Sequence, residues 1–508
     1  MTPLHSHKAT TAASPTPALE LFYDRPGQSI TQLFQQEAAQ VAAPVPPLPH
    51  EQVLACLLEQ VEPVDFRERA GLRDDRDKLT TMHYTVITIR EVQALAERND
   101  WNLTYCQGFL HSYNGSYWKH LDEVALRYFL RQAANRLGVP DIKADYHGFV
   151  ENLYKQFLAT ASLPAPAPTA RKFVSVNLQN GTYDIGLHRQ GLRAAVAADF
   201  LTHELPFAYD PAATAPRWKQ FLDRVVPDEA LQHVLAEYLA YVFIPAAQLK
   251  LEKVLLLYGT GANGKSVFFE VLTALLGPEN VSNYSLSSLT KEPAYSRAHL
   301  ATKLVNYASE LNGKLEADTF KQLASGEPVE ARLPYGQPFI MSHYAKLIFN
   351  CNELPTEVEH TNAFFRRFLI VPFSVTIPEA EQDKTLAATI VQEELAGVFN
   401  WILAGLHRLL EKRGFTHSTA IEAQLEAYKK QADTVRLFLE DASYIADPES
   451  WVKGQEVYGE YKFFCQEDGY RPVGRQKFTT RLSQAGIEQK RNKQGQLLAL
   501  RKDFLAGK

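Results

Sequence analysis

The sequence has few cysteines and no long apolar run. Its four cysteines, Cys56, Cys106, Cys351 and Cys465, lie far apart without a CxxC pair or matching histidines, which argues against a disulfide framework and against a zinc ribbon. No apolar run approaches the roughly 20 residues of a membrane span. The first 20 residues lack the apolar stretch of a secretory signal. We therefore expect a cytoplasmic protein with no membrane partner.

The charge of the chain is unevenly distributed along its 508 residues. Acidic residues outnumber basic ones, 58 to 53, yet residues 470–508 carry ten Lys and Arg residues against two Asp and Glu residues. A basic C-terminal module on an acidic body predicts a polyanionic partner at that end, although a solvated charged face would have the same composition. The length suits about three or four domains, and no internal repeat is visible.

A glycine-rich loop is the clearest motif. The apolar run at 254–258 is followed directly by GTGANGKS and then by the helix-like VFFEVLTALLG, which is the strand, loop and helix order of a phosphate-binding P-loop. Lys265 can reach the β- and γ-phosphates of a nucleoside triphosphate, and the Ser266 hydroxyl can bind Mg²⁺. The predicted nucleotide-binding residues are Gly259, Thr260, Gly261, Ala262, Asn263, Gly264, Lys265 and Ser266.

Two later β-like segments end in polar residues. The segment 303–310, KLVNYASE, ends in Glu310, whose carboxylate could polarise an attacking water and help to hold Mg²⁺, although any surface strand can end in Glu. The segment 346–355, KLIFNCNELP, places Asn352 just past its apolar run. An amide at that point could contact the γ-phosphate or orient the water.

A pair of arginines precedes a fourth apolar strand. In FFRRFLIVPF, Arg366 and Arg367 stand at the start of FLIVPF. An arginine there would lie at a domain edge, where it could reach the γ-phosphate of a neighbouring subunit and stabilise transition-state charge.

In this order, GTGANGKS, SE, NCNELP and FFRRFLIVPF resemble the superfamily 3 helicases, which are ring-forming AAA+ ATPases. The similarity is greatest to the phage and plasmid primase-helicase branch, related to the poxvirus primase-helicase. The resemblance implies ATP and Mg²⁺ as cofactors and a homo-hexamer as the assembly. It also implies roles for five positions: Lys265 and Ser266 as Walker A, Glu310 as Walker B, Asn352 as sensor 1 and Arg367 as the arginine finger, with Arg366 as the adjacent candidate. Ser309 stands where many AAA+ proteins have a second acid.

A predicted hairpin lies between Glu310 and Asn352. The cluster of Pro334, Gly336 and Pro338 indicates a turn between two strands at 332–337. In superfamily 3 rings the equivalent hairpin grips nucleic acid in the channel, so the resemblance assigns single-stranded DNA contacts to Arg332 and Tyr335. The tip lacks the lysine common in relatives, and an ordinary surface hairpin is the alternative.

The C-terminal module reads as helix, turn, helix and hairpin, the order of a winged helix. Its QKFTTRLSQAG segment is the recognition-like helix. The duplex DNA-binding candidates are Lys477, Arg481, Lys490, Arg491 and Lys493. Winged helices can bind proteins instead.

The fold class expected is α/β, with an AAA+ P-loop core, a mixed α+β N-terminal domain and a C-terminal winged helix. Hairpin signals at Asn114-Gly115 and Asn180-Gly181 lie in the mixed domain. The expected divisions are a partly disordered N-terminal region with a Pro/Ala-rich linker (1–98), the α+β domain with a helical collar (99–250), the ATPase (251–380), a helical segment (381–446) and the winged-helix module (447–508).

We expect an ATP-driven DNA helicase for replication of a phage, plasmid or integrated element. A replication initiator or loader whose ATPase only switches assembly needs the same site and stays open. A small-molecule P-loop kinase is disfavoured because it requires neither the arginine pair nor the basic tail. Asp74, Asp75 and Asp77 form a charged run without a β-like frame, so any primase is expected to be a separate chain.

Overall fold

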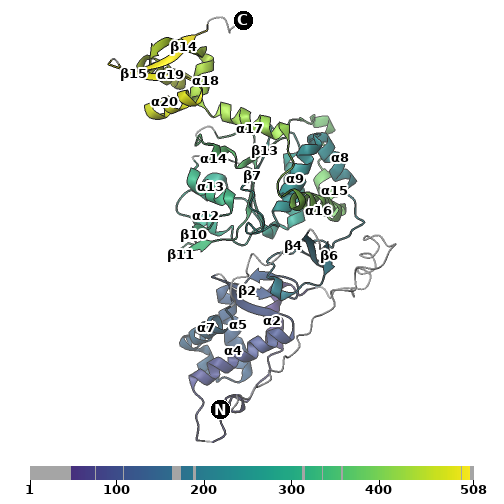
Figure 1. Cartoon of the computed structure of the whole chain (residues 1–508). Helices are drawn as coiled ribbons and strands as arrows, with labels where there is room; N and C mark the ends of the chain where they lie inside the picture. Colours follow the sequence, from purple (N-terminus) through teal and green to yellow (C-terminus); the bar gives the residue numbers. More distant parts are fainter. Residues whose placement is uncertain are drawn as a thin grey trace, which may run out of the picture. The chain divides into compact units, whose positions relative to one another are not determined.

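The computed structural model describes residues 47–74, 76–106, 108–162, 173–186, 190–309, 311, 315–334, 336–355, 358–493 and 495–503. Contacts divide the chain between Pro44 and Val45, so every described residue belongs to the second unit. Among the described residues, no helix is long and apolar enough to cross a bilayer. The structure is mixed α/β, with a parallel sheet flanked by helices (Figure 1).

Residues 50–160 form helices around a small antiparallel sheet. The sheet has the order β1-β2-β3, from Asn102–Cys106, Phe109–Tyr113 and Trp118–His120. The helices are α2 (His50–Glu59), α3 (Phe66–Arg69), α4 (Thr81–Arg98), α5 (Glu123–Leu137), α6 (Asp141–Asp145) and α7 (His147–Thr160). They share one hydrophobic core from Val53 to Ala161, so the division expected at residue 98 falls inside a continuous core.

Local signals explain where α5 begins and ends and where the β2–β3 hairpin turns. The Asp122 carboxylate accepts the Ala125 N–H at 2.9 Å and begins α5, and Gly138 ends α5 with a φ of 105°. Between β2 and β3, Asn114 Oδ1 accepts the N–H groups of Ser116 and Tyr117, each at 3.0 Å. The hairpin predicted at Asn114-Gly115 is confirmed.

The hairpin predicted at Asn180-Gly181 is confirmed, but its turn lies one residue earlier in the chain than predicted. It belongs to a sheet of order β4-β5-β6, from Phe173–Leu178, Gly181–Gly186 and Gln190–Arg193. Gly181 opens β5 with a φ of 136°, and a Cβ there would collide with the backbone carbonyl of Arg193. The turn therefore occupies Gln179 and Asn180. Two helices follow, α8 (Pro216–Val225) and α9 (Glu229–Tyr241), and the Asp228 carboxylate caps the second by accepting the Ala230 N–H at 2.8 Å.

A five-stranded parallel sheet of order β13-β7-β12-β9-β8 forms the centre of the next part. Its strands are β7 (Val254–Tyr258), β8 (Val281–Ser282), β9 (Val305–Ala308), β12 (Lys346–Cys351) and β13 (Phe368–Pro372). Both faces are buried, which explains the unbroken apolar runs. In β7, Leu255 and Leu257 face one core while Val254 and Leu256 face the other.

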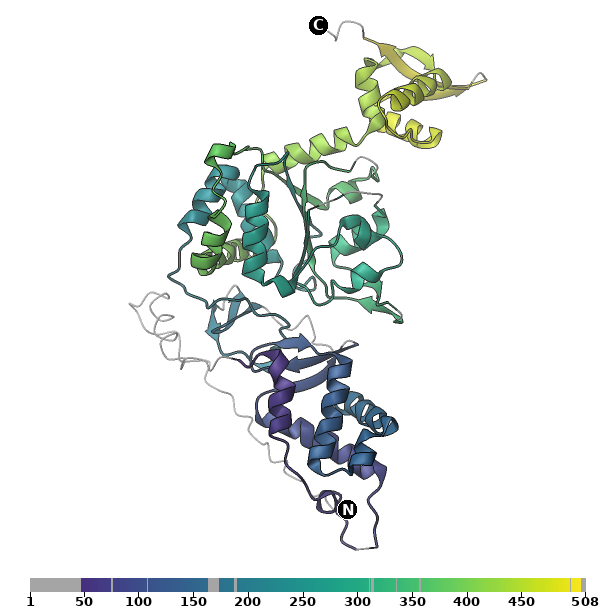
Figure 2. The same cartoon turned by 180° about the vertical axis from the view of Figure 1, so that it is seen from behind.

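Helices cover both faces of the sheet (Figures 1 and 2). One face packs against α8, α9, α10 (Lys265–Leu276), α15 (Leu386–Glu393) and α16 (Leu395–Lys412). The other packs against α11 (Leu286–Thr290), α12 (Tyr295–Ala298), α13 (Ala317–Ser325), α14 (Asn362–Phe365) and α17 (Thr419–Gln431). Because β4, β5, α8 and α9 share the first core, the division expected at residue 250 also falls inside a core.

Apolar residues at helical spacing run through residues 390–412, but this segment belongs to two helices, α15 and α16, that meet at Glu394. The Glu394 carboxylate accepts the backbone N–H groups of Arg217 at 3.1 Å and Trp218 at 3.0 Å. These groups belong to the first turn of α8 and have no partner within their own helix. The tertiary bond therefore decides where α15 ends and α16 begins.

The predicted hairpin before β12 is confirmed. Strands β10 (Val329–Arg332) and β11 (Pro338–Met341) pair antiparallel, with Arg332 opposite Pro338. Leu333 and Ile340 are exposed beside the turn.

The C-terminal module has the predicted helix, turn, helix and hairpin order and one unpredicted strand. Its elements are α18 (Thr434–Asp441), β14 (Tyr444–Lys453), α19 (Gly454–Glu467), α20 (Arg475–Gln484), β15 (Gln489–Asn492) and β16 (Gly495–Lys502), with sheet order β14-β16-β15. Residue 447 lies within β14, and α18 contributes Val435 and Phe438 to the module core. The module therefore begins near residue 433.

Candidate functional site

The predicted P-loop, residues 259–266, which we call the P-loop below, connects the carboxyl end of β7 to the N-terminus of α10. Gly264 precedes α10 with a φ of 87°, and a Cβ there would lie 2.8 Å from the Phe221 ring of α8. A Cβ at Gly259 would collide with the Asn263 amide and the Phe373 carbonyl. The loop thus needs glycine at both positions, and no side chain caps the first N–H groups of α10. Such a helix N-terminus favours an anion.

Lys265 is held inside this loop. Its Nζ donates to the Gly259 carbonyl at 2.5 Å and to Asn263 Oδ1 at 2.9 Å, and its side chain is buried. The Asn263 amide in turn donates to the Phe373 carbonyl at 3.0 Å. Burial lowers the pKa of Lys265 from its ordinary value, and this effect outweighs the opposing influence of Cys351. The Asn263 side chain therefore holds the Lys265 ammonium in position, in addition to forming part of the loop backbone.

The end of β12 lies against the P-loop. The Gly259 N–H donates to the Cys351 carbonyl at 3.1 Å, so Asn352 follows directly beside the loop and is exposed. Ser266 is also exposed. Burial raises the pKa of the Cys351 thiol to about 12. Because β12 lies between β7 and β9, the predicted sensor position stands between the P-loop and the end of β9.

A buried polar pair near this edge was missed by the sequence analysis. The Tyr307 hydroxyl of β9 donates to Asn350 Oδ1 of β12 at 2.9 Å. Both side chains are buried, and the Tyr307 ring meets Phe269 of α10 at 4.7 Å between centroids. The sequence does contain one signal for this pair, because Asn350 is a polar residue inside an apolar run, two positions before Asn352. Glu310, the predicted Walker B acid, lies outside the described residues, two positions beyond the end of β9.

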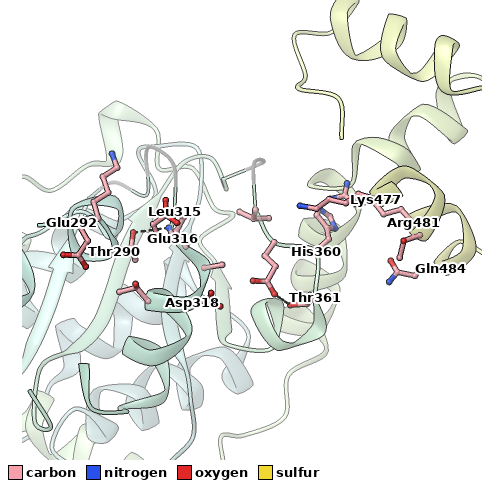
Figure 3. Close-up of a pocket in the computed structure, with 16 residues that line it drawn as sticks. Thr290, Glu292, Leu315, Glu316, Asp318, His360, Thr361, Lys477, Arg481 and Gln484 are labelled. Atoms are coloured by element: carbon pink, nitrogen blue, oxygen red, sulfur yellow. Dashed lines mark hydrogen bonds between the residues drawn. The ribbon is translucent and has the colours of Figure 1, made fainter. Parts of the chain in front are cut away.

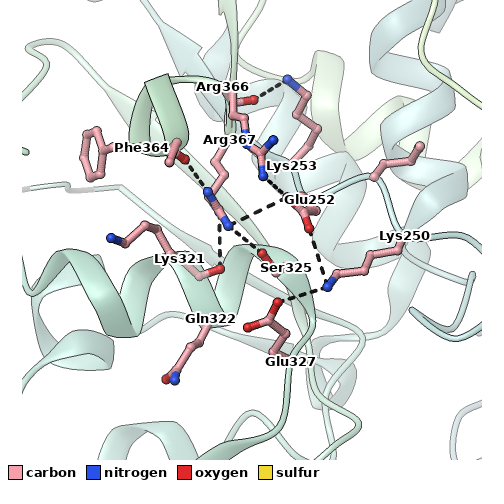
Figure 4. Close-up of polar contacts among 12 residues, drawn as sticks. Lys250, Glu252, Lys253, Lys321, Gln322, Ser325, Glu327, Phe364, Arg366 and Arg367 are labelled. Carbon is pink, nitrogen blue, oxygen red and sulfur yellow. Dashed lines mark hydrogen bonds and ion pairs between the residues drawn. The ribbon is translucent and has the colours of Figure 1, made fainter. Parts of the chain in front are cut away.

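The two arginines differ sharply in environment (Figure 4). The Arg367 side chain is 9% exposed and that of Arg366 is 55% exposed. Arg367 donates to Ser325 Oγ at 2.9 Å, to the Lys321 carbonyl at 3.3 Å and to the Ala363 carbonyl. The structure thus places Arg367 in an internal network and leaves Arg366 accessible.

Glu252 links both arginines to the segment before β7. Arg366 Nη2 lies 2.9 Å from Glu252 Oε2, and Arg367 Nη2 lies 3.7 Å from the same oxygen. Lys253 Nζ donates to the Arg366 carbonyl, and its pKa is lowered by burial and by the nearby Arg366 charge. This cluster therefore fixes the backbone that carries the arginines.

The arginines and the P-loop lie at opposite ends of two neighbouring strands, β13 and β7. Parallel pairing sets Phe368 against Val254 and Pro372 against Tyr258, so the arginines precede the strand whose far end reaches the loop. Four residue steps along a strand span about 13 Å. Neither guanidinium is therefore near the P-loop of its own chain.

The predicted DNA contacts are only partly described. Arg332 is exposed on the β10–β11 hairpin, where its Nε donates to the Gly336 carbonyl at 2.9 Å. Tyr335 lies outside the described residues.

Four of the five basic candidates in the C-terminal module are exposed: Lys477, Lys490, Arg491 and Lys493. Lys490 Nζ lies 3.6 Å from the centroid of the Trp451 ring. The fifth, Arg481, is 12% exposed and pairs with Asp433 at 3.2 Å. Figure 3 shows Lys477 and Arg481 on α20 beside a hollow of about 960 Å³ that includes no P-loop residue.

Two family models match the chain. One, described as D5 N terminal like, matches residues 92–227, and the other, a family of unknown function (DUF5906), matches residues 257–367. The second match runs from the P-loop strand to Arg367.

Similar curated proteins come from large DNA viruses. "Putative helicase L207/L206" of Acanthamoeba polyphaga mimivirus is 23% identical over 313 residues, covering 56% of this chain and 32% of the viral protein. "Putative helicase 121R" of Invertebrate iridescent virus 3 is 24% identical over 306 residues, covering 52% and 32%. The chain thus matches about a third of the length of these relatives.

A solved structure, the apo NrS-1 C terminal region, matches with a TM-score of 0.43 and 12% identity over 69% of this chain and 76% of that one. The family-model and viral matches support a relationship to the phage and viral primase-helicases.

Proposed function

We propose that this protein is an ATP-hydrolysing DNA helicase of superfamily 3. In this proposal it acts as a ring of identical subunits, expected to be a hexamer, in the replication of a phage, plasmid or integrated element. The observation that supports the proposal is that the glycine-rich loop follows the carboxyl end of β7, while the exposed Arg366 lies at the amino end of the neighbouring strand β13. The helicase names of the viral relatives agree with it.

The P-loop fits the phosphates of ATP. Glycine is required at Gly259 and Gly264 for steric reasons, the start of α10 has no side-chain cap, and Lys265 Nζ bonds to the Gly259 carbonyl inside the same loop. The uncapped N–H groups and the Lys265 ammonium would hold the phosphates, and Ser266 with Glu310 would hold Mg²⁺. The metal would neutralise charge on the phosphate oxygens. Glu310 would take a proton from the attacking water while Asn352 orients that water.

The arginine edge fits catalysis across a subunit interface. Arg366 lies far from its own P-loop, and its side chain is accessible. In a ring, each subunit presents one edge to the P-loop of the next. Arg366 would then stabilise charge on the neighbour's phosphates, while Arg367 anchors the segment through Ser325 and Lys321. The exposure of Arg366 favours it over Arg367 as the finger.

DNA contacts would come from two regions. Arg332 on the β10–β11 hairpin would bind the backbone of single-stranded DNA, and Tyr335 would offer a stacking face. The C-terminal module would act as a winged helix, with α20 in a major groove of duplex DNA and the β15–β16 hairpin against the phosphates.

A strand-displacement assay on a forked DNA duplex tests the proposal. The wild-type chain and Lys384→Ala, which replaces an exposed lysine outside the site, should unwind the duplex with ATP, and Lys265→Ala should not. ATP hydrolysis stimulated by DNA without any strand displacement would instead identify an initiator or loader. Hydrolysis that no DNA stimulates would contradict both functions.

A further inference from the structure

A second surface of the C-terminal module differs in chemistry from its basic residues. Helices α18 and α19 border a hollow of about 590 Å³. Three aromatic side chains, Phe438, Phe463 and Phe464, line it together with the carboxylates of Asp441, Glu460, Glu467 and Asp468. Of these carboxylates, Glu460 pairs with Lys502 Nζ at 3.0 Å. No Lys or Arg lines this hollow, which we call the α18–α19 groove.

Phe463 is the most exposed aromatic side chain among the described residues, with 63% of its surface accessible. Its neighbour Phe464 packs inward instead, at 5.9 Å from the Phe438 ring and 5.8 Å from the Tyr470 ring. Exposing a phenyl ring to this degree forgoes about 1 to 2 kcal/mol of hydrophobic stabilisation. A partner that covers Phe463 would recover it.

Gly459 opens the groove further. It lies inside α19, one helical turn before Phe463, and a Cβ at this position would meet nothing within 4 Å. Its backbone needs no positive φ, and a glycine in a helix interior costs about 1 kcal/mol relative to alanine. Neither strain nor a neighbouring atom accounts for this glycine, whereas a close-packed partner would.

The carboxylates stand where a helix disfavours them. Asp441 ends α18, while Glu467 ends α19 and Asp468 caps it, and neither last turn contains a basic residue. A helix C-terminus carries partial negative charge, so each carboxylate there is unfavourable by about 0.3 to 1 kcal/mol. Within the part of the chain that the structure describes, these three side chains make no ion pair. These three carboxylates therefore give the groove a net negative charge, which is unfavourable for nucleic acid.

We propose that the α18–α19 groove docks a basic, amphipathic helix of a partner protein, with an apolar side chain against Phe463 and lysines or arginines against Asp441, Glu467 and Asp468. Charge complementarity selects this occupant. The wing of a second copy does not fit, because Lys490, Arg491 and Lys493 have no apolar residue between them. The module would thus join DNA to a second replication protein through two faces of opposite charge.

Fluorescence polarisation tests this proposal with the full chain and a labelled model peptide. The peptide has about 16 residues, roughly four helical turns, with leucines along one face and lysines elsewhere. A scrambled peptide of the same composition and a version with glutamates for lysines are the peptide controls. The wild-type chain should bind the amphipathic lysine peptide at least about tenfold more tightly than either control, a difference of about 1.4 kcal/mol.

Variants of the groove then test its apolar contact and its carboxylates separately. Phe463→Ser should weaken binding about tenfold, whereas Tyr128→Ser, at a similarly exposed aromatic on α5, should not. Asp441→Asn/Glu467→Gln/Asp468→Asn should weaken binding and flatten its salt dependence, unlike the matched Glu62→Gln/Glu97→Gln/Glu411→Gln. Thermal unfolding confirms that each variant is folded, and DNA-stimulated ATP hydrolysis should stay unchanged.

Three results would overturn the proposal. The first is equal affinity for the amphipathic and scrambled peptides, and the second is equal affinity of the wild-type chain and the groove variants. The third is a loss of DNA affinity or of self-association in Phe463→Ser without peptide, which would assign the groove to DNA or to a second copy of the chain.

Discussion

Arg366 Nη2 lies 2.9 Å from Glu252 Oε2, at the amino ends of the two strands whose carboxyl ends adjoin the P-loop. The ion pair holds the Arg366 guanidinium at the amino ends of these strands, away from the P-loop of the same chain. In the proposed ring, a second copy of the chain would bring the arginine to the nucleotide phosphates. The predictions below therefore test the proposal that catalysis is completed at a subunit interface.

The nucleotide site predicts different effects for its two central residues. Lys265→Ala should lose ATP binding and hydrolysis together, because its ammonium is aimed into the loop by Asn263. Glu310→Gln should keep binding while hydrolysis falls by about 100-fold or more, since an amide cannot act as a base. Titration with a fluorescent ATP analogue measures binding, and release of phosphate measures hydrolysis, so the two assays distinguish the effects of the two substitutions. Loss of binding in Glu310→Gln would make that residue chiefly a metal ligand.

The arginine pair predicts a division between stability and activity. Arg367→Ala removes a buried group bonded to Ser325 and Lys321, so it should lower the free energy of unfolding by about 2 to 4 kcal/mol. Arg366→Ala removes an exposed ion pair and should cost less than about 1 kcal/mol while abolishing hydrolysis. Urea unfolding measures both values. A stable, inactive Arg367→Ala beside an active Arg366→Ala would reverse the assignment.

The C-terminal module predicts a reduced salt dependence of DNA binding. Lys477→Gln/Arg491→Gln/Lys493→Gln removes three exposed cations, and each phosphate that is no longer neutralised should lower the slope of log affinity against log salt by about 0.9. Titrations of a labelled duplex at several salt concentrations give the slope. An unchanged slope would assign these residues to protein contacts.

Arg481 should behave differently from those three lysines and arginines. Its pairing with Asp433 is largely buried, so Arg481→Gln should destabilise the module by about 1 to 3 kcal/mol. The salt slope should hardly change. A reduced slope at full stability would show instead that Arg481 leaves Asp433 to contact DNA.

The thiol beside the P-loop predicts a reactivity pattern. Burial raises the pKa of Cys351 to about 12, so at pH 8 only about one molecule in ten thousand carries the thiolate. The native protein should therefore react with a thiol reagent first at the partly exposed Cys56, and at Cys351 only after unfolding in urea. Mass spectrometry of labelled peptides locates the modified cysteines. Rapid native labelling of Cys351 would show that the P-loop edge opens to solvent.

The strands around the site were predictable because burial on both faces leaves an apolar run in the sequence. VLLLY, KLIFNC and FLIVP each became a parallel strand, and polar residues followed the first two. Strand β14 was missed because it lies at a sheet edge, contains Pro448 and is irregular between Ala446 and Trp451, so its alternation is lost.

Partners distant in sequence were not predictable. Asn263 bonds to the carbonyl of Phe373 and Arg367 to the hydroxyl of Ser325, and no local pattern announces either bond. The same holds for Glu394, whose bonds to α8 divide one amphipathic pattern into two helices. Motifs therefore supplied the candidate residues, while the difference in exposure between Arg366 and Arg367 required the folded structure.

The most direct test mixes two inactive variants. Arg366→Ala subunits keep a complete P-loop, and Lys265→Ala subunits keep the arginine. In a ring assembled from equal amounts, about a quarter of the interfaces would pair an intact P-loop with an intact arginine. Phosphate release should therefore reappear on mixing, up to about a quarter of the wild-type rate, and should be absent from each variant alone. A mixture as inactive as its components would contradict catalysis across the interface.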